Sequence, residues 1–279
     1  MPELPEVETM RRGILEIEGA KILDVHRLPC KRKPICCTPA IRSFRSRTRG
    51  KKVAAVERIG KRVVMRLEND ERIIFEPRMT GLVLTTDPPS KEHLRFRVDM
   101  ACTTVPNIWY WDRRGLGSVR LMNPSEFAIA LGPDKLGPDA LLITAEQMRD
   151  RLKSSRRAIK VALLDQKVVA GVGNLYASEL LHLAAVHPAR RCDRITKKQW
   201  ARIHESMLEI LNLAIKYEGS TLGDGTYRTA LNDPGGYQNH HRVYDRHGDT
   251  CTTCGESTIE RIVQTQRSTF FCPNCQRNR

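Results

Sequence analysis

The chain opens with Met1-Pro2-Glu3-Leu4-Pro5-Glu6-Val7-Glu8-Thr9, and this segment indicates the structure of its amino-terminal part. Its apolar residues recur at helical spacing and continue through Ile14 and Ile17. This pattern predicts a helix that carries Pro2 and Glu3 at its tip. Proline is tolerated in the first turn of a helix, so the two prolines of this stretch could also serve only to begin it.

Pro2 would also be chemically reactive as the first residue of a processed chain. Removal of Met1, which a small second residue favours, would make Pro2 a free secondary amine. An α-amino group has a pKa of about 8, against about 10.4 for lysine, so much of it is unprotonated at neutral pH. Such an amine attacks an aldehyde-level carbon, such as the anomeric carbon of a sugar, and the resulting iminium favours elimination at the neighbouring C–H. Glu3 beside it would serve as an acid or a base.

The composition indicates a folded protein with a polyanionic partner. Lys and Arg number 47 against 32 Asp and Glu, which gives a net charge of +15 at pH 7. This charge favours nucleic acid over a small acidic metabolite, although an evenly solvated basic surface would give the same count. With 279 residues, 40% of them hydrophobic, the chain can build two or three domains.

The sequence argues against a secreted or membrane protein. Membrane insertion needs a run of about 18 apolar residues, and the chain contains none. A signal peptide starts basic and continues apolar, whereas this terminus is acidic and contains proline. We therefore expect a cytoplasmic, nucleoid-associated protein that does not bind a membrane. We also expect a monomer, since no heptad pattern is present.

Short β-type runs follow between Lys51 and Met122. Val63-Val64-Met65 and Ile73-Ile74-Phe75 are apolar, and residues 94–98 alternate between apolar and polar. No helical segments alternate with these runs. The pattern therefore predicts an antiparallel β-sandwich or barrel with the N-terminal helix packed against it.

After about Asn123 the pattern becomes helical. Two capping boxes, Thr144–Gln147 and Thr196–Gln199, predict helix starts, and the second leads into an apolar stripe that ends near Gly219. Such a stripe is typical of core packing. Residues 221–241 are rich in Gly, Asp, Asn and Tyr, and a connection this long is either mobile, functional or both.

Two C-x2-C pairs stand near the carboxyl end: Cys251-Thr-Thr-Cys254 and Cys272-Pro-Asn-Cys275. Four thiolates at this spacing predict a closed tetrahedral site for one structural Zn²⁺ ion, which would not be catalytic. Two disulfides or idle thiols are the alternative, and the odd total of nine cysteines without an export signal argues against it. The residues between the pairs should fold as a hairpin. The metal would supply the folding free energy that about 30 residues cannot.

Further segments suggest contacts with phosphates or bases. The turn Gly171-Val-Gly-Asn174 opens a helix whose backbone N–H groups form an anion site, although a plain turn between two helices would look the same. Arg267, in the expected hairpin, would be held rigidly enough to grip a phosphate. Lys61 and Arg114 lie in basic stretches that could also be solubility devices. Met79 follows a strand, where it is either core or a wedge between bases.

Together, the stretch Pro2–Thr9, the Gly171–Asn174 turn and the four-cysteine segment resemble the formamidopyrimidine-DNA glycosylase family, of the Fpg/Nei type. The resemblance covers both ends and the middle of the chain. It implies a multidomain α+β fold. The implied domains are an N-terminal catalytic β-sandwich with an N-terminal helix (1–135), a helical helix-two-turn-helix domain with a lesion-capping loop (136–245), and a C-terminal β-hairpin zinc finger (246–279).

The resemblance also implies a function, which is base-excision repair of damaged double-stranded DNA. Pro2 would attack C1′ of a damaged nucleotide, release the oxidised base through a Schiff base and cleave the strand by β and δ elimination. Glu3 would give and accept protons near the sugar, and Lys61 would contact a phosphate and support the lyase steps. The other implied site residues bind DNA. Asn174 and the catalytic Arg267 would hold the phosphates that flank the lesion. Met79, Arg114 and Leu116 would fill the gap left by the extruded base, with Arg114 facing the orphaned cytosine.

The opening stretch resembles the branch that excises oxidised purines, 8-oxoguanine and formamidopyrimidines, more than the endonuclease VIII branch. Leu116 stands where the family often has phenylalanine, and Glu76 and Arg78 lie in a segment where many relatives carry a histidine and a glycine. Two alternatives stay open. One is a pyrimidine-preferring Nei-type glycosylase, and the other is a catalytically inactive zinc-finger protein that only binds lesions.

Overall fold

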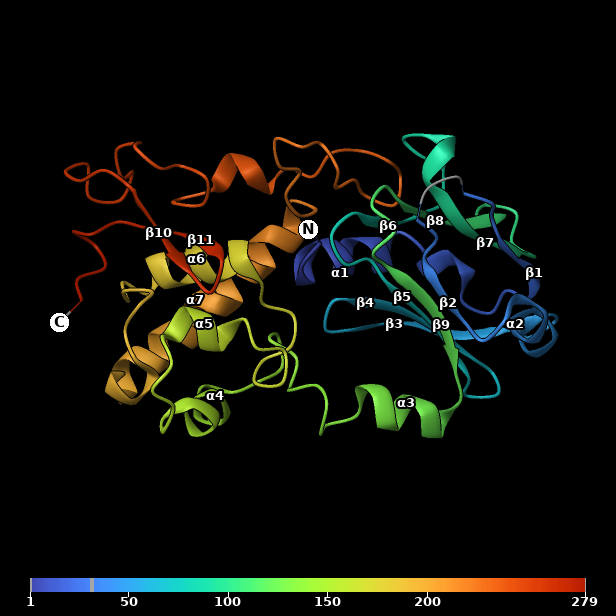
Figure 1. Cartoon of the computed structure of the whole chain (residues 1–279), viewed down its shortest axis with the longest axis horizontal. Helices are drawn as coiled ribbons and strands as arrows, with labels where there is room; N and C mark the ends of the chain where they lie inside the picture. Colours follow the sequence, from blue (N-terminus) through green and yellow to red (C-terminus); the bar gives the residue numbers. More distant parts are fainter. Residues whose placement is uncertain (1, 31–32, 279) are drawn as a thin grey trace. The chain divides into compact units, whose positions relative to one another are not determined.

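The computed structural model describes residues 2–30 and 33–278, and it confirms the predicted α+β fold class (Figure 1). Its contacts divide the chain into two compact units. The first unit consists of Met1–Gly132 and Ile215–Gln238, and the second of Pro133–Ala214 and Asn239–Arg279. Residues 215–238 therefore pack with the β-rich part of the chain. The division into three domains at 135 and 245 stays a prediction.

Two β-sheets make up most of the first unit, and one hydrophobic core joins them. Val25 and Ile108 from one sheet and Val63, Phe75 and Val119 from the other are fully buried in it. The first sheet has the order β1 (Ile22–Arg27), β7 (Leu94–Met100), β8 (Asn107–Asp112) and β6 (Gly81–Leu84). The second has the order β2 (Cys36–Thr38), β9 (Ser118–Met122), β5 (Arg72–Glu76), β4 (Arg62–Leu67) and β3 (Val53–Ile59). The pairings are those of the predicted antiparallel sandwich, except that β2 joins β9 in parallel.

Strands β4 and β5 bury both of their faces, which explains their unbroken apolar sequences. Val63 and Phe75 belong to the core shared by the two sheets. Val64 and Ile74 pack on the other face with Leu131 of α3 (Pro124–Leu131). A strand covered on both faces has no polar side, so its sequence does not alternate.

Helix α1 (Leu4–Arg12) begins directly after Pro2 and Glu3, as predicted. Its fully buried apolar side packs against β3 and β4. A second helix, α2 (Ile41–Thr48), lies beside β1 and buries Phe44. The sandwich therefore holds the tip of α1 in a defined place.

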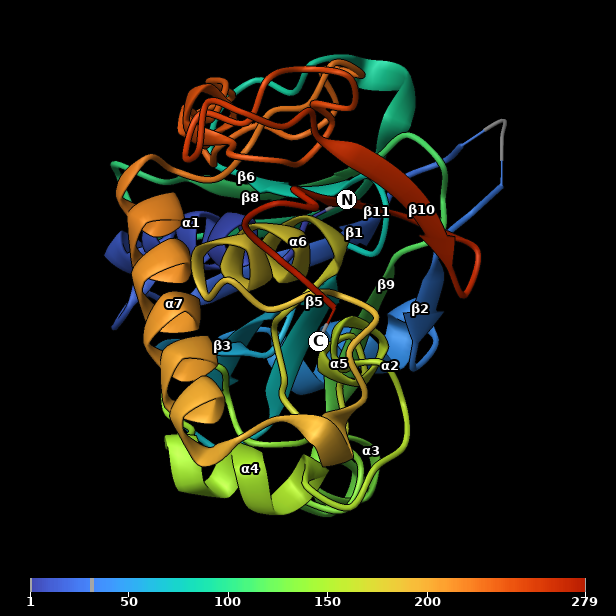
Figure 2. The ribbon, with the colours of Figure 1, turned by 90° about the vertical axis from the view of Figure 1, so that its left-hand side faces the viewer.

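Helices and one hairpin build the second unit. Both predicted capping boxes are present: the side chain of Thr144 accepts the backbone N–H of Gln147 at 3.2 Å, and that of Thr196 accepts the N–H of Gln199 at 3.3 Å. The elements are α4 (Ala145–Leu152), α5 (Ile159–Leu163), α6 (Asn174–Leu183), most of α7 (Lys197–Lys216), and the hairpin strands β10 (Glu260–Gln264) and β11 (Arg267–Phe271). Figure 2 shows α6 beside this hairpin, in agreement with the contacts between α6 and β11.

The long connection after α7 is held by hydrogen bonds. Thr221 Oγ1 donates to the carbonyl oxygen of Tyr227 at 2.8 Å and accepts the N–H of Gly235 at 2.9 Å. The N–H of Thr85 donates to the carbonyl oxygen of Ala230 at 2.9 Å. These bonds attach the connection to itself and to the end of β6.

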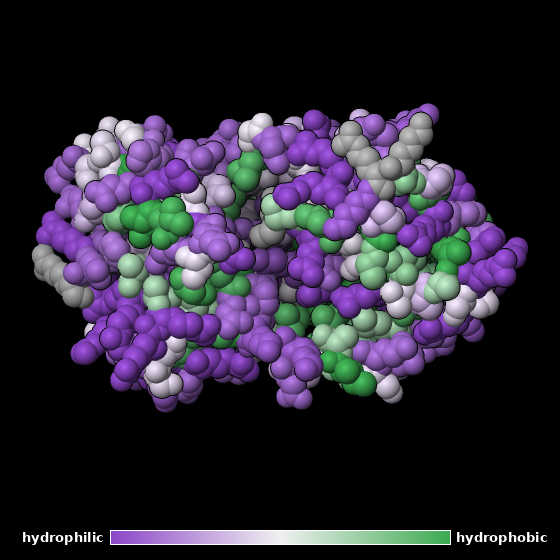
Figure 3. All heavy atoms as spheres, in the orientation of Figure 1, coloured by the Kyte–Doolittle hydropathy of each residue, from purple (hydrophilic) through white to green (hydrophobic). Residues whose placement is uncertain are grey.

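Hydrophilic residues cover most of the face drawn in Figure 3, and its hydrophobic residues form small separate groups. This surface fits a chain with a net charge of +15. Within residues 2–30 and 33–278, no helix has the length and apolar character that crossing a membrane requires.

Candidate functional site

The first turn of α1 holds Pro2 and Glu3 in buried positions. Glu3 is 3% exposed, and its backbone N–H donates to Oε2 of Glu6 at 2.8 Å. The other oxygen of Glu6, Oε1, accepts the N–H of Ser220 at 2.9 Å, although the two residues are 214 positions apart. A Cβ at Gly219 would lie 2.9 Å from Oε1 of Glu6, so this close approach requires glycine. One carboxylate, which no local sequence pattern marks, therefore joins the helix tip to the connection after α7.

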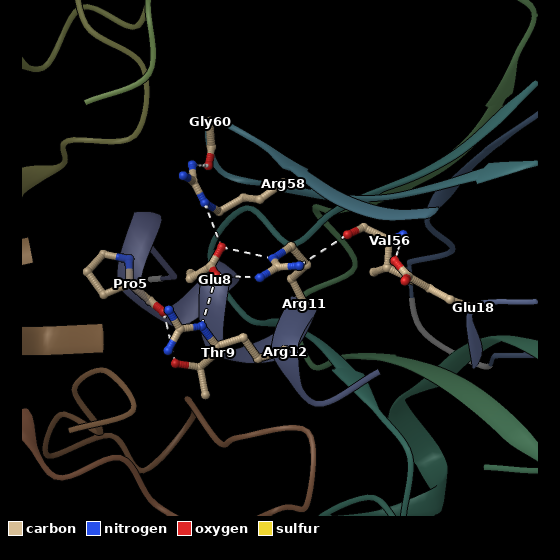
Figure 4. Close-up of polar contacts among 9 residues, drawn as sticks. All are labelled: Pro5, Glu8, Thr9, Arg11, Arg12, Glu18, Val56, Arg58 and Gly60. Carbon is tan, nitrogen blue, oxygen red and sulfur yellow. Dashed lines mark hydrogen bonds and ion pairs between the residues drawn. The ribbon is translucent and has the colours of Figure 1, made fainter. Parts of the chain in front are cut away.

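Lys61 lies in the tight turn between β3 and β4, directly after Gly60, whose φ of +56° is left-handed. Arg58 braces this turn, because its Nη1 donates to the carbonyl oxygen of Gly60 at 3.0 Å. The Nε of Arg58 donates to Oε2 of Glu8 on α1 at 3.1 Å (Figure 4). One arginine thus connects the helix that carries Pro2 to the turn that carries Lys61.

Glu8 is a buried carboxylate surrounded by arginines. It is 7% exposed and accepts hydrogen bonds from Arg11 at 2.7 and 3.0 Å and from Arg12 at 2.9 Å, besides the bond from Arg58 (Figure 4). Burial raises the pKa of Glu8, but the hydrogen bonds from Arg11 and Arg12 and the charges of Arg11 and Arg58 outweigh it. The pKa therefore lies below its usual value. At neutral pH the ionised carboxylate fastens α1 to the sheet.

Met79, Arg114 and Leu116 come to the same end of the β6–β8 pair. The register pairs Gly81 with Asp112, so the turn before β6 and the loop after β8 begin side by side. Met79 and Leu116 are each 38% exposed, and Arg114 is exposed as well. Two apolar side chains and one guanidinium thus share this end of the sheet.

Asp112 fixes these two segments to each other. It is fully buried, and its carboxylate accepts hydrogen bonds from Thr80 Oγ1 at 2.5 Å, the N–H of Arg114 at 3.2 Å and the N–H of Gly117 at 2.8 Å. The N–H of Arg114 also donates to Thr80 Oγ1 at 3.0 Å. The buried Arg95 donates its Nε to the carbonyl oxygen of Asp112 at 2.8 Å. No local sequence pattern indicates this network, which sets the geometry of the loop.

Asn174 and Arg267 lie close together in the second unit. Asn174 begins α6 after a turn in which Gly171 has a φ of +110°. Its Nδ2 donates to the carbonyl oxygen of Ser268 at 3.0 Å. Arg267 directly precedes Ser268 in β11 and is exposed. The start of α6 and the tip of the hairpin therefore form one surface.

A buried lysine, Lys160, supports this surface. Lys160 is 1% exposed, and its Nζ donates to Oδ1 of Asn174 at 2.7 Å, to Oγ1 of Thr269 at 2.7 Å and to the carbonyl oxygen of Ser268 at 3.0 Å. Neutral oxygens thus accept all three hydrogens of the ammonium group. A single lysine in a helical pattern gives no signal in the sequence that could have predicted this role.

The four cysteines form a site for one structural Zn²⁺ ion. Their Sγ atoms lie within 4.8 Å of one another, and the Cys251–Cys275 and Cys254–Cys272 pairs are each 3.8 Å apart. A tetrahedron with Zn–S bonds of about 2.3 Å has S–S edges of about 3.8 Å, so the donor set fits the ion. A disulfide would need an S–S distance of about 2.05 Å. Because four thiolates complete the tetrahedron, the ion stabilises the fold and leaves no position for a substrate.

His182 extends the zinc site into α6. Its Nε2 lies 3.6 Å from Sγ of Cys251. Burial lowers the pKa of His182 to about 4, and the charge of Arg242 acts in the same direction. An N–H of the ring directed at the sulfur would orient the ligand. Helix α6 thus contacts the zinc site through His182 and the hairpin through Asn174.

Family models match three parts of the chain. They describe the N-terminal domain of formamidopyrimidine-DNA glycosylase (residues 1–119), the H2TH domain of formamidopyrimidine-DNA glycosylase (residues 131–225), and a zinc finger found in FPG and IleRS (residues 248–278). The third match includes all four zinc-binding cysteines.

Curated relatives and solved structures agree with these matches. The formamidopyrimidine-DNA glycosylases of Chloroflexus aurantiacus and Herpetosiphon aurantiacus are each 36% identical to the chain over 282 residues, with coverage of 99% of this chain and of 98% and 100% of theirs. The Lactococcus lactis Fpg in a complex with abasic-site DNA has a TM-score of 0.85 at 31% identity, covering 99% of this chain and 100% of that one. The MutM (Fpg) protein of Thermus thermophilus has a TM-score of 0.85 at 32% identity, covering 99% and 98%. With this similarity along its whole length, the chain belongs to the formamidopyrimidine-DNA glycosylase family and is a DNA-repair glycosylase with a zinc finger.

Proposed function

We propose that the chain removes oxidised purines from duplex DNA and then cleaves the strand at the resulting site, with Pro2 as the nucleophile. The observation that carries the proposal is the buried position of Pro2 and Glu3 at the tip of α1. Glu8 and Arg58 connect that helix to the turn of Lys61. A helix fastened in this way gives the amine little freedom, which favours a near-attack geometry at a bound sugar.

The reaction begins when the lone pair of the mature Pro2 nitrogen attacks C1′ of the damaged nucleotide. The bond from C1′ to the base breaks, the base leaves with the bonding electrons and takes up a proton, and opening of the sugar gives an iminium between Pro2 and C1′. The iminium withdraws electrons, so a C2′ proton is removed and the 3′ phosphate leaves. A second elimination releases the 5′ phosphate, and water hydrolyses the iminium. Glu3 gives and accepts the protons at the sugar.

DNA binding in this proposal uses residues from both units. Lys61, Asn174 and Arg267 hold phosphates next to the lesion and read no sequence. Extruding the damaged nucleotide costs a few kcal/mol, which side chains inserted into the gap partly offset. The inserted side chains are those of Met79, Arg114 and Leu116. The enzyme acts as a monomer on nucleoid DNA, with functional domains 1–135, 136–245 and 246–279.

The proposed lesions are 8-oxoguanine and formamidopyrimidines. The names of the relatives support this class, and a mutant of Lactococcus lactis Fpg, 32% identical to the chain, was solved with DNA that contains Fapy-dG. The matching experiment presents the processed chain with duplexes that carry 8-oxoguanine, formamidopyrimidine or thymine glycol. We expect faster release of the two purine lesions. Faster release of thymine glycol would assign a pyrimidine preference, and binding without release would leave only a lesion-binding protein.

A further inference from the structure

Three arginines of the first unit converge on the carboxylate of Glu76. Arg62 and Arg78 each lie 3.1 Å from Oε1, and Arg120 lies 3.1 Å from Oε2. The arginines come from the start of β4, from the turn after β5 and from β9. These four residues, Arg62, Glu76, Arg78 and Arg120, form the Glu76 cluster.

The register of the sheet explains why these side chains meet. Strands β4 and β5 pair Val63 with Phe75, so Arg62 stands opposite Glu76. Strand β9 lies on the other side of β5, where Arg120 is the diagonal cross-strand neighbour of Glu76. Because Val63 and Phe75 face the core and successive side chains alternate, Arg62 and Glu76 lie on the opposite face of the sheet.

The Glu76 cluster contains more positive charge and more N–H donors than its one acceptor satisfies. Three guanidiniums against one carboxylate leave 3 − 1, a net charge of +2. In the described part of the chain, the buried Nε atoms of Arg62 and Arg120 have no hydrogen-bond acceptor. Burial lowers the pKa of Arg62, and the charges of Arg120 and Arg78 lower it further against the opposing effect of Glu76. The Glu76 cluster therefore carries a surplus of positive charge that a second anion would neutralise.

Glu76 and Arg78 differ in how far their side chains are exposed to solvent. The side chain of Glu76 is 12% exposed, whereas that of Arg78 is 64% exposed. Glu76 is thus an anchor inside the Glu76 cluster, and Arg78 opens the cluster to solvent. Arg78 directly precedes Met79, and Arg62 directly follows Lys61. Met79 and Lys61 are both proposed DNA contacts.

We infer that the Glu76 cluster binds one phosphodiester group of the DNA backbone. A guanidinium offers a planar fork of donors that matches the two free oxygens of a phosphodiester. The bonds to Glu76 hold the forks in place before DNA arrives, so little side-chain entropy is lost on binding. The inference rests on the DNA binding in the proposed function and is independent of the reaction at Pro2.

The test measures binding of the full chain to a duplex with a stable abasic-site analogue over a series of KCl concentrations. The variant combines Arg78→Gln with Arg120→Gln. The matched control combines Arg66→Gln with Arg72→Gln, because Arg66 and Arg72 pair with each other at the opposite end of β4 and β5. Loss of one phosphate contact should reduce the slope of log Kd against log [KCl] by about 1 in the variant and leave it unchanged in the control.

A double variant that keeps the wild-type slope and the wild-type Tm would overturn the inference. If the double variant unfolds, Arg78→Gln alone decides, since Arg78 is exposed; it should retain the wild-type Tm and reduce the slope, and an unchanged slope would overturn the inference. Base release is measured on the same proteins. If the wild type releases base and the variant keeps the wild-type salt slope, only the phosphate site is refuted. A reduced slope in a chain that releases no base supports the site and refutes the enzymatic proposal.

Discussion

Ser220 donates its backbone N–H to the carboxylate of Glu6 at 2.9 Å, which ties the first turn of α1 to the connection that follows α7. The same carboxylate accepts the N–H of Glu3 at 2.8 Å. The proposed acid–base residue and the connection after α7 therefore share one anchor. A substitution of Glu6 should therefore affect both the tip of α1 and the connection after α7.

Glu6→Gln tests this coupling. A glutamine side chain has one oxygen in place of two, so one of the two backbone N–H groups loses its acceptor, at a cost of about 1–3 kcal/mol. We expect faster hydrogen exchange at Glu3 or Ser220, and slower base release. Glu16→Gln is the control, because Glu16 is exposed and should change neither. Unaltered exchange at both Glu3 and Ser220 in Glu6→Gln would show that this side chain does not anchor the two segments.

Glu8 should make the stability of the first unit sensitive to acid. Its folded-state pKa lies below the ordinary value of a glutamate in an unfolded chain. Its contribution is therefore complete above that value and is lost as the pH falls through the folded-state pKa. We expect Glu8→Gln to lower the free energy of unfolding at pH 7 by about 3 kcal/mol. The variant should also lose less stability than the wild type between pH 7 and about pH 3.

Urea unfolding at several pH values measures both effects of Glu8→Gln. The control is Glu57→Gln, which removes a more exposed partner of Arg66 and should change the free energy of unfolding by less than about 0.5 kcal/mol. A Glu8→Gln variant with the same dependence on pH as the wild type would contradict the role given to this carboxylate.

Asp112 should control the choice of the base opposite the lesion. Asp112→Ala leaves Thr80 Oγ1 and the N–H groups of Arg114 and Gly117 without this acceptor, so it should destabilise the chain by about 3 kcal/mol. The loop of Arg114 would then move, and the preference for cytosine over adenine opposite 8-oxoguanine should fall. Thr80→Val removes only one donor and should cost about 1 kcal/mol. Base release from the two duplexes measures the preference, and an unchanged ratio in Asp112→Ala would exclude this role.

Zinc removal should abolish DNA affinity while the β-sandwich stays folded. Chelation or Cys272→Ser breaks the tetrahedron, and a segment this short has no adequate core without the ion. Arg267 and the bonds of Asn174 and Lys160 to Ser268 would then lose their support. Hydrogen exchange should become fast in the hairpin and stay slow in β4 and β5. Cys36→Ser at an exposed position is the control, and DNA binding that survives chelation would contradict the prediction.

Features with a local signal could be predicted from the sequence. The start of α1, the capping boxes at Thr144 and Thr196 and the zinc-binding cysteines each depend on residues a few positions apart, and the structure contains all of them. Strands β1 and β2 were missed, since both precede Lys51, where the β-type pattern begins. Strand β2 has only three residues and pairs in parallel, so it has no periodicity to detect.

The polar framework around the candidate site could not be predicted. Glu8 meets Arg58, Thr80 meets Asp112 and Lys160 meets Thr269 only after the chain has folded, because these partners are far apart in the sequence. Residue type and spacing indicate a helix or a metal ligand but not a tertiary hydrogen bond. The chemical roles of Pro2, Glu3, Lys61 and the DNA-contacting residues stay predictions for the same reason.

Borohydride trapping tests directly whether Pro2 is the nucleophile. The experiment uses chains that intact mass shows to lack Met1 and a duplex that contains 8-oxoguanine. We expect a covalent protein–DNA complex with the wild type and with Pro5→Ala, and a large loss of that complex with Pro2→Gly. Equal trapping by Pro2→Gly, or no trapping by the processed wild type, would contradict the assignment of Pro2 as the nucleophile.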